Sequence, residues 1–237
     1  MSRGIYRFKV RSYECGPDGH ATLPTVCNYL QEAASLNAED LGFSKSNFAA
    51  AGENISWVLT RLVVKMNRYP SWEEEIIVET FPRGGTKFVA WRDFELKDAQ
   101  GEVLGLATSE WMLIDLASRK IVQVPESVLG FVDPANIPVL GLTPFARFKF
   151  QGEPSEPLVF KAMNAHIDLN GHVNNVHYIA WMLEPCAGHS PKEMEMVFRS
   201  ETLAGDEVRV ETAESEGYTY HRVFSPQGKD HIVARTR

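Results

Sequence analysis

The chain has 237 residues, of which 44% are hydrophobic and 11% aromatic, and it carries 24 Lys and Arg against 31 Asp and Glu. The resulting net charge of −7 argues against a general nucleic-acid-binding protein, which needs a basic stripe to neutralise phosphates. The hydrophobic content is sufficient for a sizeable core, and the length lies between that of one large domain and two small ones.

Apolar runs and cysteines in the sequence indicate where in the cell the protein is expected. No apolar run approaches the roughly 20 residues that a membrane span requires, and the first 13 residues carry charges where a signal peptide needs an apolar centre. The three cysteines, Cys15, Cys27 and Cys186, lack the spacing of a zinc site and fit a reducing compartment. We therefore expect a cytoplasmic protein with no membrane span.

The first half of the chain predicts one strand, one long helix and then several strands. Apolar and charged residues alternate over 6–11, which is the period of a strand with one buried face. Thr22 as a cap and Pro24 in the first turn predict a long helix that ends at Gly42. Residues 55–115 contain four β-rich runs separated by turn residues. This order is typical of an α+β fold.

The pattern then restarts after a proline-rich segment. Six of the 13 prolines lie within 125–157, which predicts a linker over the surface. At an offset of 152 residues, five positions are identical and fall in the same predicted elements: Phe8 and Phe160, Lys9 and Lys161, Gly19 and Gly171, His20 and His172, Glu32 and Glu184. The first copy carries about 20 extra residues after its helix, over 36–55.

The chain is therefore predicted to be a duplicated strand-helix-sheet unit. A long helix embedded in a curved antiparallel sheet, twice over, resembles a tandem hot-dog fold. We expect an N-terminal hot-dog domain over 1–115, a linker over 116–157 and a C-terminal hot-dog domain over 158–237.

The densest polar cluster is HIDLNGHVNNVHYIAWMLE, residues 166–184. Asp168, Asn170 and His172 alternate along it, so an extended segment would point all three side chains the same way. An imidazole, a carboxylate and a carboxamide form a plausible catalytic set near neutral pH. The alternative interpretation is a helix-entry loop in which Asp168 and Asn170 only satisfy backbone groups. His20 lacks equivalent neighbours in the first copy, which favours a structural role there.

This cluster resembles the signature of the plant-type acyl-acyl-carrier-protein (acyl-ACP) thioesterases. Three further segments are similar to the same family in the same order: ISWVLTRLVVKMNRYPSWEEEIIVETF, AWRDFEL and ATSEWMLIDLASRKIVQVPESV. The similarity extends over about 6–210, and the segments of the first half distinguish this family from other hot-dog proteins. The resemblance implies hydrolysis of fatty acyl-ACP to free fatty acid and holo-ACP, without a cofactor.

The resemblance also implies the site residues. Asp168, Asn170 and His172 would be catalytic, together with Glu201, which the family has on the next strand. Many members have a cysteine after that glutamate, whereas this chain has Thr202. Attack by water, activated by Glu201 or His172, or by the carboxylate of Glu201 itself, is therefore expected. Asn170 and the backbone N–H groups near Val173 and Asn174 would stabilise the oxyanion, and Asp168 would orient the loop or His172.

The acyl chain and the carrier protein would contact other parts of the chain. The first copy would hold the acyl chain through Leu30, Leu41, Phe43, Phe48, Trp57 and Leu59. The carrier is strongly acidic, so a protein of net charge −7 needs a local basic patch to bind it. The candidates are Arg83, Lys87, Arg92, Arg147, Lys149 and Lys161.

Other functions remain as alternatives. A hot-dog acyl-CoA thioesterase and a non-catalytic acyl-binding hot-dog protein both fit the fold. The sequence has no nucleophile elbow, no phosphate loop and no His-Glu-x-x-His pair, and we expect no metal site. A monomer and a homodimer are both compatible with a fused pair of units.

Overall fold

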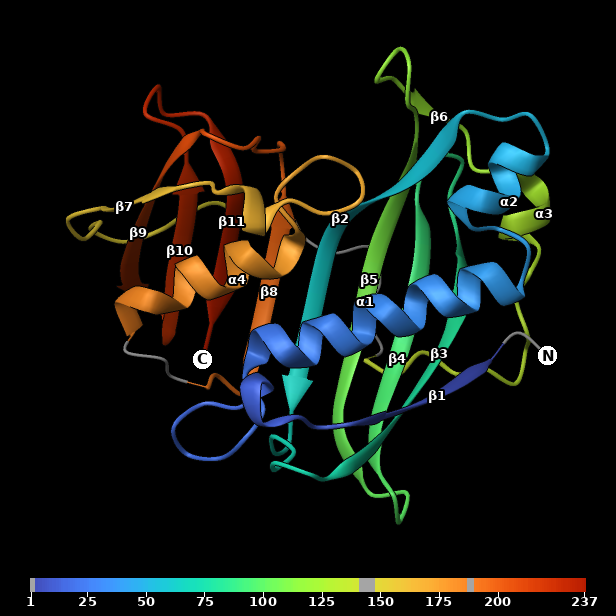
Figure 1. Ribbon diagram of the computed structural model, residues 1–237, viewed down its shortest axis with the longest axis horizontal. Helices are drawn as coiled ribbons and strands as arrows, with labels where there is room; N and C mark the ends of the chain where they lie inside the picture. Colours follow the sequence, from blue (N-terminus) through green and yellow to red (C-terminus); the bar gives the residue numbers. More distant parts are fainter. Residues whose placement is uncertain (1–2, 141–147, 187–189) are drawn as a thin grey trace.

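Two helices of unequal length lie along one face of a single curved sheet (Figure 1). The computed structural model describes residues 3–140, 148–186 and 190–237. The helix α1 (Leu23–Asp40) crosses the strands of the first unit, and α4 (Asn175–Leu183) crosses those of the second. The two helices therefore form one layer and the sheet the other.

The first unit contains eight elements besides α1. They are β1 (Gly4–Lys9), α2 (Lys45–Ala50), β2 (Ile55–Met66), β3 (Glu75–Gly85), β4 (Ala90–Asp98), β5 (Val103–Asp115), β6 (Ile121–Val122) and α3 (Glu126–Leu129). The second unit contains β7 (Leu158–Lys161), β8 (Glu193–Phe198), β9 (Glu207–Ser215), β10 (Tyr218–Phe224) and β11 (Asp230–Thr236) besides α4. Short 3₁₀ turns are η1 (Ser12–Glu14), η2 (Asn164–His166) and η3 (Glu184–Cys186).

The order of the strands reflects the duplication. The sheet reads β1-β3-β4-β5-β2-β8-β11-β10-β9-β7, with β6 paired to β5, and the described pairings are antiparallel. Each half of this order is the mirror of the other when the elements are numbered within their own unit. The halves join where β2 pairs β8, from Arg61 opposite Val197 to Lys65 opposite Glu193. The chain thus has the predicted tandem hot-dog fold, with one continuous sheet.

The first helix forms where the sequence predicts it. The Thr22 hydroxyl accepts a hydrogen bond from the Thr25 backbone at 3.3 Å, and Gly42 after the last turn has a φ of 80°. Its apolar stripe, which includes Val26 and Leu30, is buried against the sheet. The second helix is shorter than predicted, with nine residues against 18 in α1. Only one of the two helices is therefore long.

The extra residues of the first copy form a cap at one end of α1. Residues 36–40 lengthen α1, and the following residues fold into α2, which packs on β2 (Figure 1). Trp57 on β2 donates from Nε1 to the Phe43 carbonyl at 2.8 Å, and its ring lies 6.2 Å from that of Phe48. These aromatic contacts hold α2 against the sheet.

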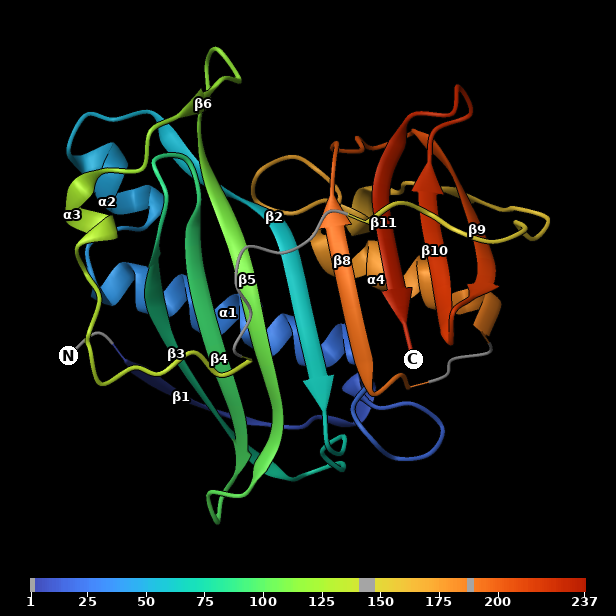
Figure 2. The ribbon, with the colours of Figure 1, turned by 180° about the vertical axis from the view of Figure 1, so that it is seen from behind.

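Of the segment 116–157, β6 pairs with β5 and α3 lies beside α2, whereas the described residues that flank 141–147 run over the outer face of the sheet, opposite the helices (Figure 2). This segment contains β6 and α3 in addition to irregular chain. The backbone N–H of Val139 donates to the buried Asp93 carboxylate at 3.0 Å, which pins the segment to β4. Phe148 lies against the guanidinium groups of Arg61 and Arg235. Within the described ranges, none of the helices combines the length and hydrophobicity of a transmembrane segment.

Candidate active site

The segment from Asp168 to His172 is a tight turn and not the extended strand that the sequence predicted. The backbone N–H of Asp168 donates to the His172 carbonyl at 2.9 Å, and that of Gly171 donates to the Asp168 carbonyl at 3.0 Å. Ile167 and Val173 pair across the base of the turn. Gly171 has a φ of 80°, which glycine adopts at little cost. Because of these hydrogen bonds across the loop, the three side chains do not point the same way, as they would in an extended strand.

Asp168 and Asn170 have different partners in this turn. The Asp168 carboxylate accepts a hydrogen bond from the Asn170 backbone N–H at 2.8 Å, as in the alternative, structural interpretation. Among the described residues we find no hydrogen bond between this carboxylate and the His172 ring. The exposed Asn170 side chain accepts at Oδ1 from Lys45 Nζ of α2 at 3.2 Å. Its Nδ2 group makes no hydrogen bond to another described residue.

His172 and Glu201 are brought together by two neighbouring loops. His172 Nε2 lies 3.1 Å from Glu201 Oε2, with 22% and 40% of the two side chains exposed. Glu201 does not lie on a strand, as the resemblance implied, but in the loop that follows β8. The Val173 N–H donates to the Thr202 carbonyl at 3.0 Å and ties the two loops to each other. An imidazole and a carboxylate thus form an accessible acid-base pair.

A third side chain in this cluster comes from the first unit and was missed in the sequence. Arg119, in the turn between β5 and β6, donates from Nη2 to both carboxylate oxygens of Glu201. The only signal for it was its place within the segment ATSEWMLIDLASRKIVQVPESV that resembles the family. A separation of 82 residues from Glu201 gives no local pattern that could predict the contact.

The predicted oxyanion donors at the start of α4 need a correction. The N–H of Val173 is bonded to Thr202, and that of Asn174 donates to the His166 carbonyl at 2.9 Å, so neither is available. The Asn174 side chain caps the helix by accepting from the Val176 N–H at 3.1 Å. In the described part of the chain, the Asn175 N–H has no acceptor. This group at the positive end of α4 is the better candidate donor.

Thr202 is a buried residue in this arrangement. Its exposed fraction is 0%, and its carbonyl accepts the bond from Val173. Its hydroxyl oxygen is buried as well. Many family members have a cysteine at this position, whereas in this chain it holds a threonine that is buried in the interior.

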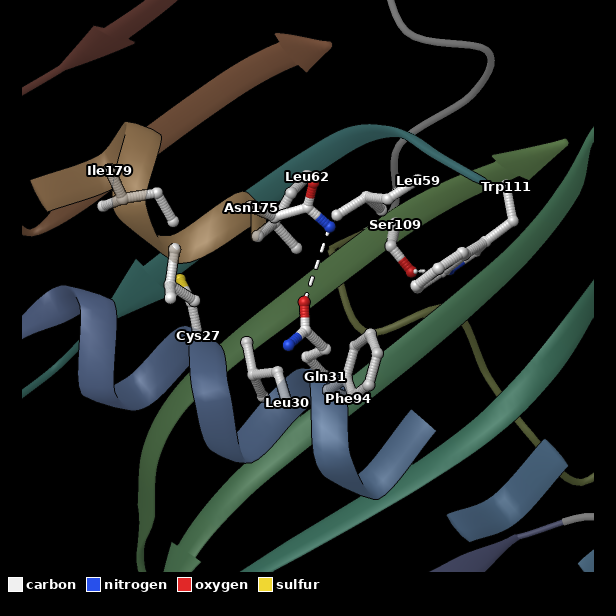
Figure 3. A pocket seen from close by; sticks show the side chains of 11 residues that line it. Cys27, Leu30, Gln31, Leu59, Leu62, Phe94, Ser109, Trp111, Asn175 and Ile179 are labelled. Atoms are coloured by element: carbon white, nitrogen blue, oxygen red, sulfur yellow. Dashed lines mark hydrogen bonds between the residues drawn. The ribbon is translucent and has the colours of Figure 1, made fainter. Parts of the chain in front are cut away.

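A narrow pocket opens between α1, α4 and the sheet, next to the start of α4 (Figure 3). Its walls are mostly apolar, and its residues are Cys27, Leu30, Gln31, Leu59, Leu62, Phe94, Ser109, Trp111, Asn175, Val176 and Ile179. Asn175 Nδ2 donates to Gln31 Oε1 at 3.4 Å across the gap between the helices (Figure 3). The space accessible to a water-sized molecule is about 20 Å³, close to that of one water.

The predicted acyl-contacting residues fall into two groups. Leu30 and Leu59 line the pocket, and the Asn174 side chain borders it through a 3.5 Å contact with Gln31. The other predicted residues lie around α2 and do not line this pocket: Leu41, Phe43, Phe48 and Trp57. Val173 is buried beneath the turn. Contact of any of them with an acyl chain remains a prediction.

Two of the predicted docking cations are turned inward. Arg92 donates from Nη1 to Asn37 Oδ1 at 2.6 Å, and burial lowers the pKa of its guanidinium to about 10. Arg83 forms an ion pair of 3.2 Å with Asp93, whose side chain is fully buried. Both arginines are therefore occupied inside the first unit and are poor candidates for a docking surface.

The remaining docking cations do not form one patch. Lys87 is exposed in the turn between β3 and β4, whereas Lys161 is exposed on β7, near the opposite end of the sheet. Lys149 is exposed in the segment that precedes β7. Arg147 lies outside the described residues. Across the described ranges, no group of three or more His, Cys, Asp or Glu side chains is placed to hold a metal ion.

Comparisons with known proteins agree with this architecture. The family model described as the acyl-ACP thioesterase N-terminal domain matches residues 5–131, and that of the C-terminal domain matches residues 152–237. A palmitoyl-acyl carrier protein thioesterase of Gossypium hirsutum is 35% identical over 188 residues, which cover 75% of this chain and 45% of the relative. An oleoyl-acyl carrier protein thioesterase of Arabidopsis thaliana is 34% identical over 192 residues, covering 75% and 52%. The chain spans about half the length of these curated relatives.

Two solved structures match nearly the whole chain. An acyl-ACP thioesterase from Bacteroides thetaiotaomicron superimposes with a TM-score of 0.86 and 25% identity, covering 99% of this chain and 97% of the other. A 12:0-ACP thioesterase from Umbellularia californica superimposes with a TM-score of 0.85 and 26% identity, covering 100% and 97%.

Proposed function

The chain belongs to the acyl-ACP thioesterase family, and on that premise we propose that it hydrolyses the thioester of fatty acyl-ACP to free fatty acid and holo-ACP. The observation that carries the proposal is the pair of His172 and Glu201, which lies just before the start of α4, where Asn175 lines the apolar pocket. Water is the nucleophile, because the position after Glu201 holds a buried Thr202 in place of a thiol, and both oxygens of the Glu201 carboxylate already accept hydrogen bonds from Arg119.

The geometry favours His172 as the base. Both oxygens of Glu201 accept hydrogen bonds from Arg119, and one of them also contacts His172 Nε2. A carboxylate held in this way orients the imidazole and leaves Nδ1 to take the proton from water. The water oxygen then bonds to the thioester carbon, the C–S bond breaks, and the imidazolium gives its proton to the leaving thiolate, which becomes the free thiol.

The developing negative charge needs donors close to the thioester carbonyl. We assign this role to Asn170 Nδ2 and the backbone N–H of Asn175, which replace the Val173 and Asn174 donors. The acyl chain enters between α1 and α4. Because the described space is about that of one water, side chains between the two helices must move apart to admit it.

Substitution of the pair tests the function directly. The purified protein is incubated with a panel of acyl-ACPs and acyl-CoAs, and the freed fatty acids are quantified. We expect His172→Ala and Glu201→Gln to lower kcat by about 10²–10⁴-fold, which is the usual contribution of acid-base catalysis. The matched control is His20→Ala, at the equivalent position of the first unit, which is expected to keep the wild-type rate.

Three results would contradict the proposal. Wild-type rates for both His172→Ala and Glu201→Gln would exclude the pair from catalysis. Faster release from acyl-CoA than from acyl-ACP would favour the acyl-CoA thioesterase, and tight acyl binding without turnover would favour a non-catalytic acyl-binding protein. We also infer a cytoplasmic location, which fractionation of the expressing cells tests.

A further inference from the structure

We propose that Arg119 is a positioning residue for hydrolysis, which the first unit supplies to hold the Glu201 carboxylate in place beside His172. The inference rests on the proposed function and deepens it. It makes the site of the second unit dependent on one side chain of the first.

The contacts of Glu201 come from two sides. Arg119 Nη2 donates to both of its oxygens, and His172 Nε2 lies 3.1 Å from Oε2. A carboxylate with one partner can rotate about its last bonds, whereas two fixed partners set both its position and its plane. Arg119 thus determines where the carboxylate meets the imidazole.

The turn that carries Arg119 is well anchored. Asp115 accepts at its carbonyl from the Arg119 N–H at 2.9 Å, and its side chain accepts from the Ser118 N–H at 2.6 Å. Arg119 itself has a φ of 58°, a left-handed conformation that residues with a side chain rarely adopt. Since β5 pairs β2, and β2 pairs β8, the sheet holds this turn in register with the loop of Glu201.

The simplest alternative is an incidental surface ion pair. The side chains of Arg119 and Glu201 are 42% and 40% exposed, and pairs this exposed contribute little to stability. The two interpretations therefore predict different results. An incidental pair changes neither stability nor kcat, whereas a positioning pair leaves stability nearly unchanged and lowers kcat.

The kinetic experiment compares Arg119→Ala, Arg119→Lys and, as the matched control, Lys120→Ala on the adjacent exposed cation. We expect Arg119→Ala to lower kcat by about 10²-fold with little change in KM, because a displacement of about 1 Å at a catalytic group has that effect. Arg119→Lys is expected to recover part of the loss, and Lys120→Ala to behave as wild type. Thermal unfolding is expected to be unchanged in all three.

A double substitution shows whether Arg119 acts through Glu201. In the Glu201→Gln background, Arg119→Ala should add little further loss, since its partner is already altered. Additive losses would overturn the proposal, and so would a wild-type kcat in Arg119→Ala. A rise in KM alone would also overturn it, because Arg119 would then be a substrate-binding residue.

One measurement does not depend on turnover. A crystal structure of Arg119→Ala should show the Glu201 carboxylate displaced from His172 Nε2, from which it lies 3.1 Å in the wild type. An unchanged contact between the two side chains would contradict the proposal. If the wild type hydrolysed none of the thioesters, the proposed function would fail, and this structure would still decide whether Arg119 positions the carboxylate.

Discussion

The carboxylate of Asp168 is engaged with its own loop, through the hydrogen bond from the Asn170 N–H. Sequence alternation suggested that Asp168, Asn170 and His172 point the same way, but the turn directs them to different partners. A carboxylate can stabilise the backbone of its loop or take part in catalysis, and its role depends on which hydrogen-bond donor lies within about 3 Å. The sequence does not show that donor, whereas the folded loop does.

Substitution of Asp168 separates its two roles. Asp168→Asn keeps an oxygen that accepts from the Asn170 N–H, so we expect it to retain kcat within about tenfold of wild type. Asp168→Ala removes the acceptor, loosens the turn and is expected to lower kcat by about 10²-fold. Equal losses in the two variants would show instead that the negative charge of Asp168 acts on His172. Thermal unfolding of both variants serves as the control for folding.

At the scale of elements, a fully buried histidine lies in the sheet beneath α4. His221 on β10 has no exposed surface, and its Nε2 lies 2.8 Å from the Thr236 hydroxyl of β11. Burial lowers the pKa of His221 from 6.5 to about 4, and a contact with the Met182 carbonyl of α4 offsets this only partly. The neutral ring is thus part of the packing beneath α4.

This histidine predicts acid sensitivity. Because the pKa of His221 is lower in the folded protein than in the unfolded chain, its contribution is fully present above 6.5 and is lost as the pH falls toward 4. We expect the free energy of unfolding to be about 2 kcal/mol smaller near pH 5 than near pH 7.5 from this group alone. Burial also lowers the pKa of His177 and His231, which adds in the same direction.

Denaturant unfolding at the two pH values measures this effect. His221→Gln retains a polar side chain without a group that titrates in this range, so the decrease should be smaller in the variant by about the same 2 kcal/mol. An equal decrease in wild type and variant would assign the acid sensitivity to other groups.

The prediction of elements succeeded where the signals are local. The cap at Thr22 and the left-handed Gly42 delimit α1 within a few residues of each end, and four strands follow over 55–115 as expected. The length of α4 was overestimated, because its apolar stripe continues beyond Leu183 into the 3₁₀ turn η3. Periodicity shows that a helix is present, but less reliably where it ends.

At the scale of the whole molecule, the charge of −7 limits how an acidic carrier protein can bind. Arg83 and Arg92 are occupied by Asp93 and Asn37, which leaves Lys87, Lys149 and Lys161 as the exposed candidates among the described residues. These lysines are spread along the sheet, so each one tests a different docking surface.

Salt dependence measures whether docking is electrostatic. At 0.1 M salt, charges attract each other only over a screening length of about 10 Å. Added salt should therefore lower kcat/KM for acyl-ACP more steeply than kcat/KM for acyl-CoA. Charge reversal at the true docking lysine, by Lys87→Glu, Lys149→Glu or Lys161→Glu, should reduce both kcat/KM for acyl-ACP and its salt dependence. Parallel salt responses for the two substrates would argue against a basic docking surface.

The sequence alone determined the duplicated α+β architecture and the candidates Asp168, Asn170 and His172, because periodicity, caps and short motifs act over a few neighbouring residues. Its resemblance to the family added Glu201. The tertiary structure decided which of them meet. It joined the two units through β2 and β8, placed Lys45 on Asn170 across 125 residues and placed Arg119 on Glu201 across 82. Such contacts depend on sheet register and loop closure, which only the folded chain establishes.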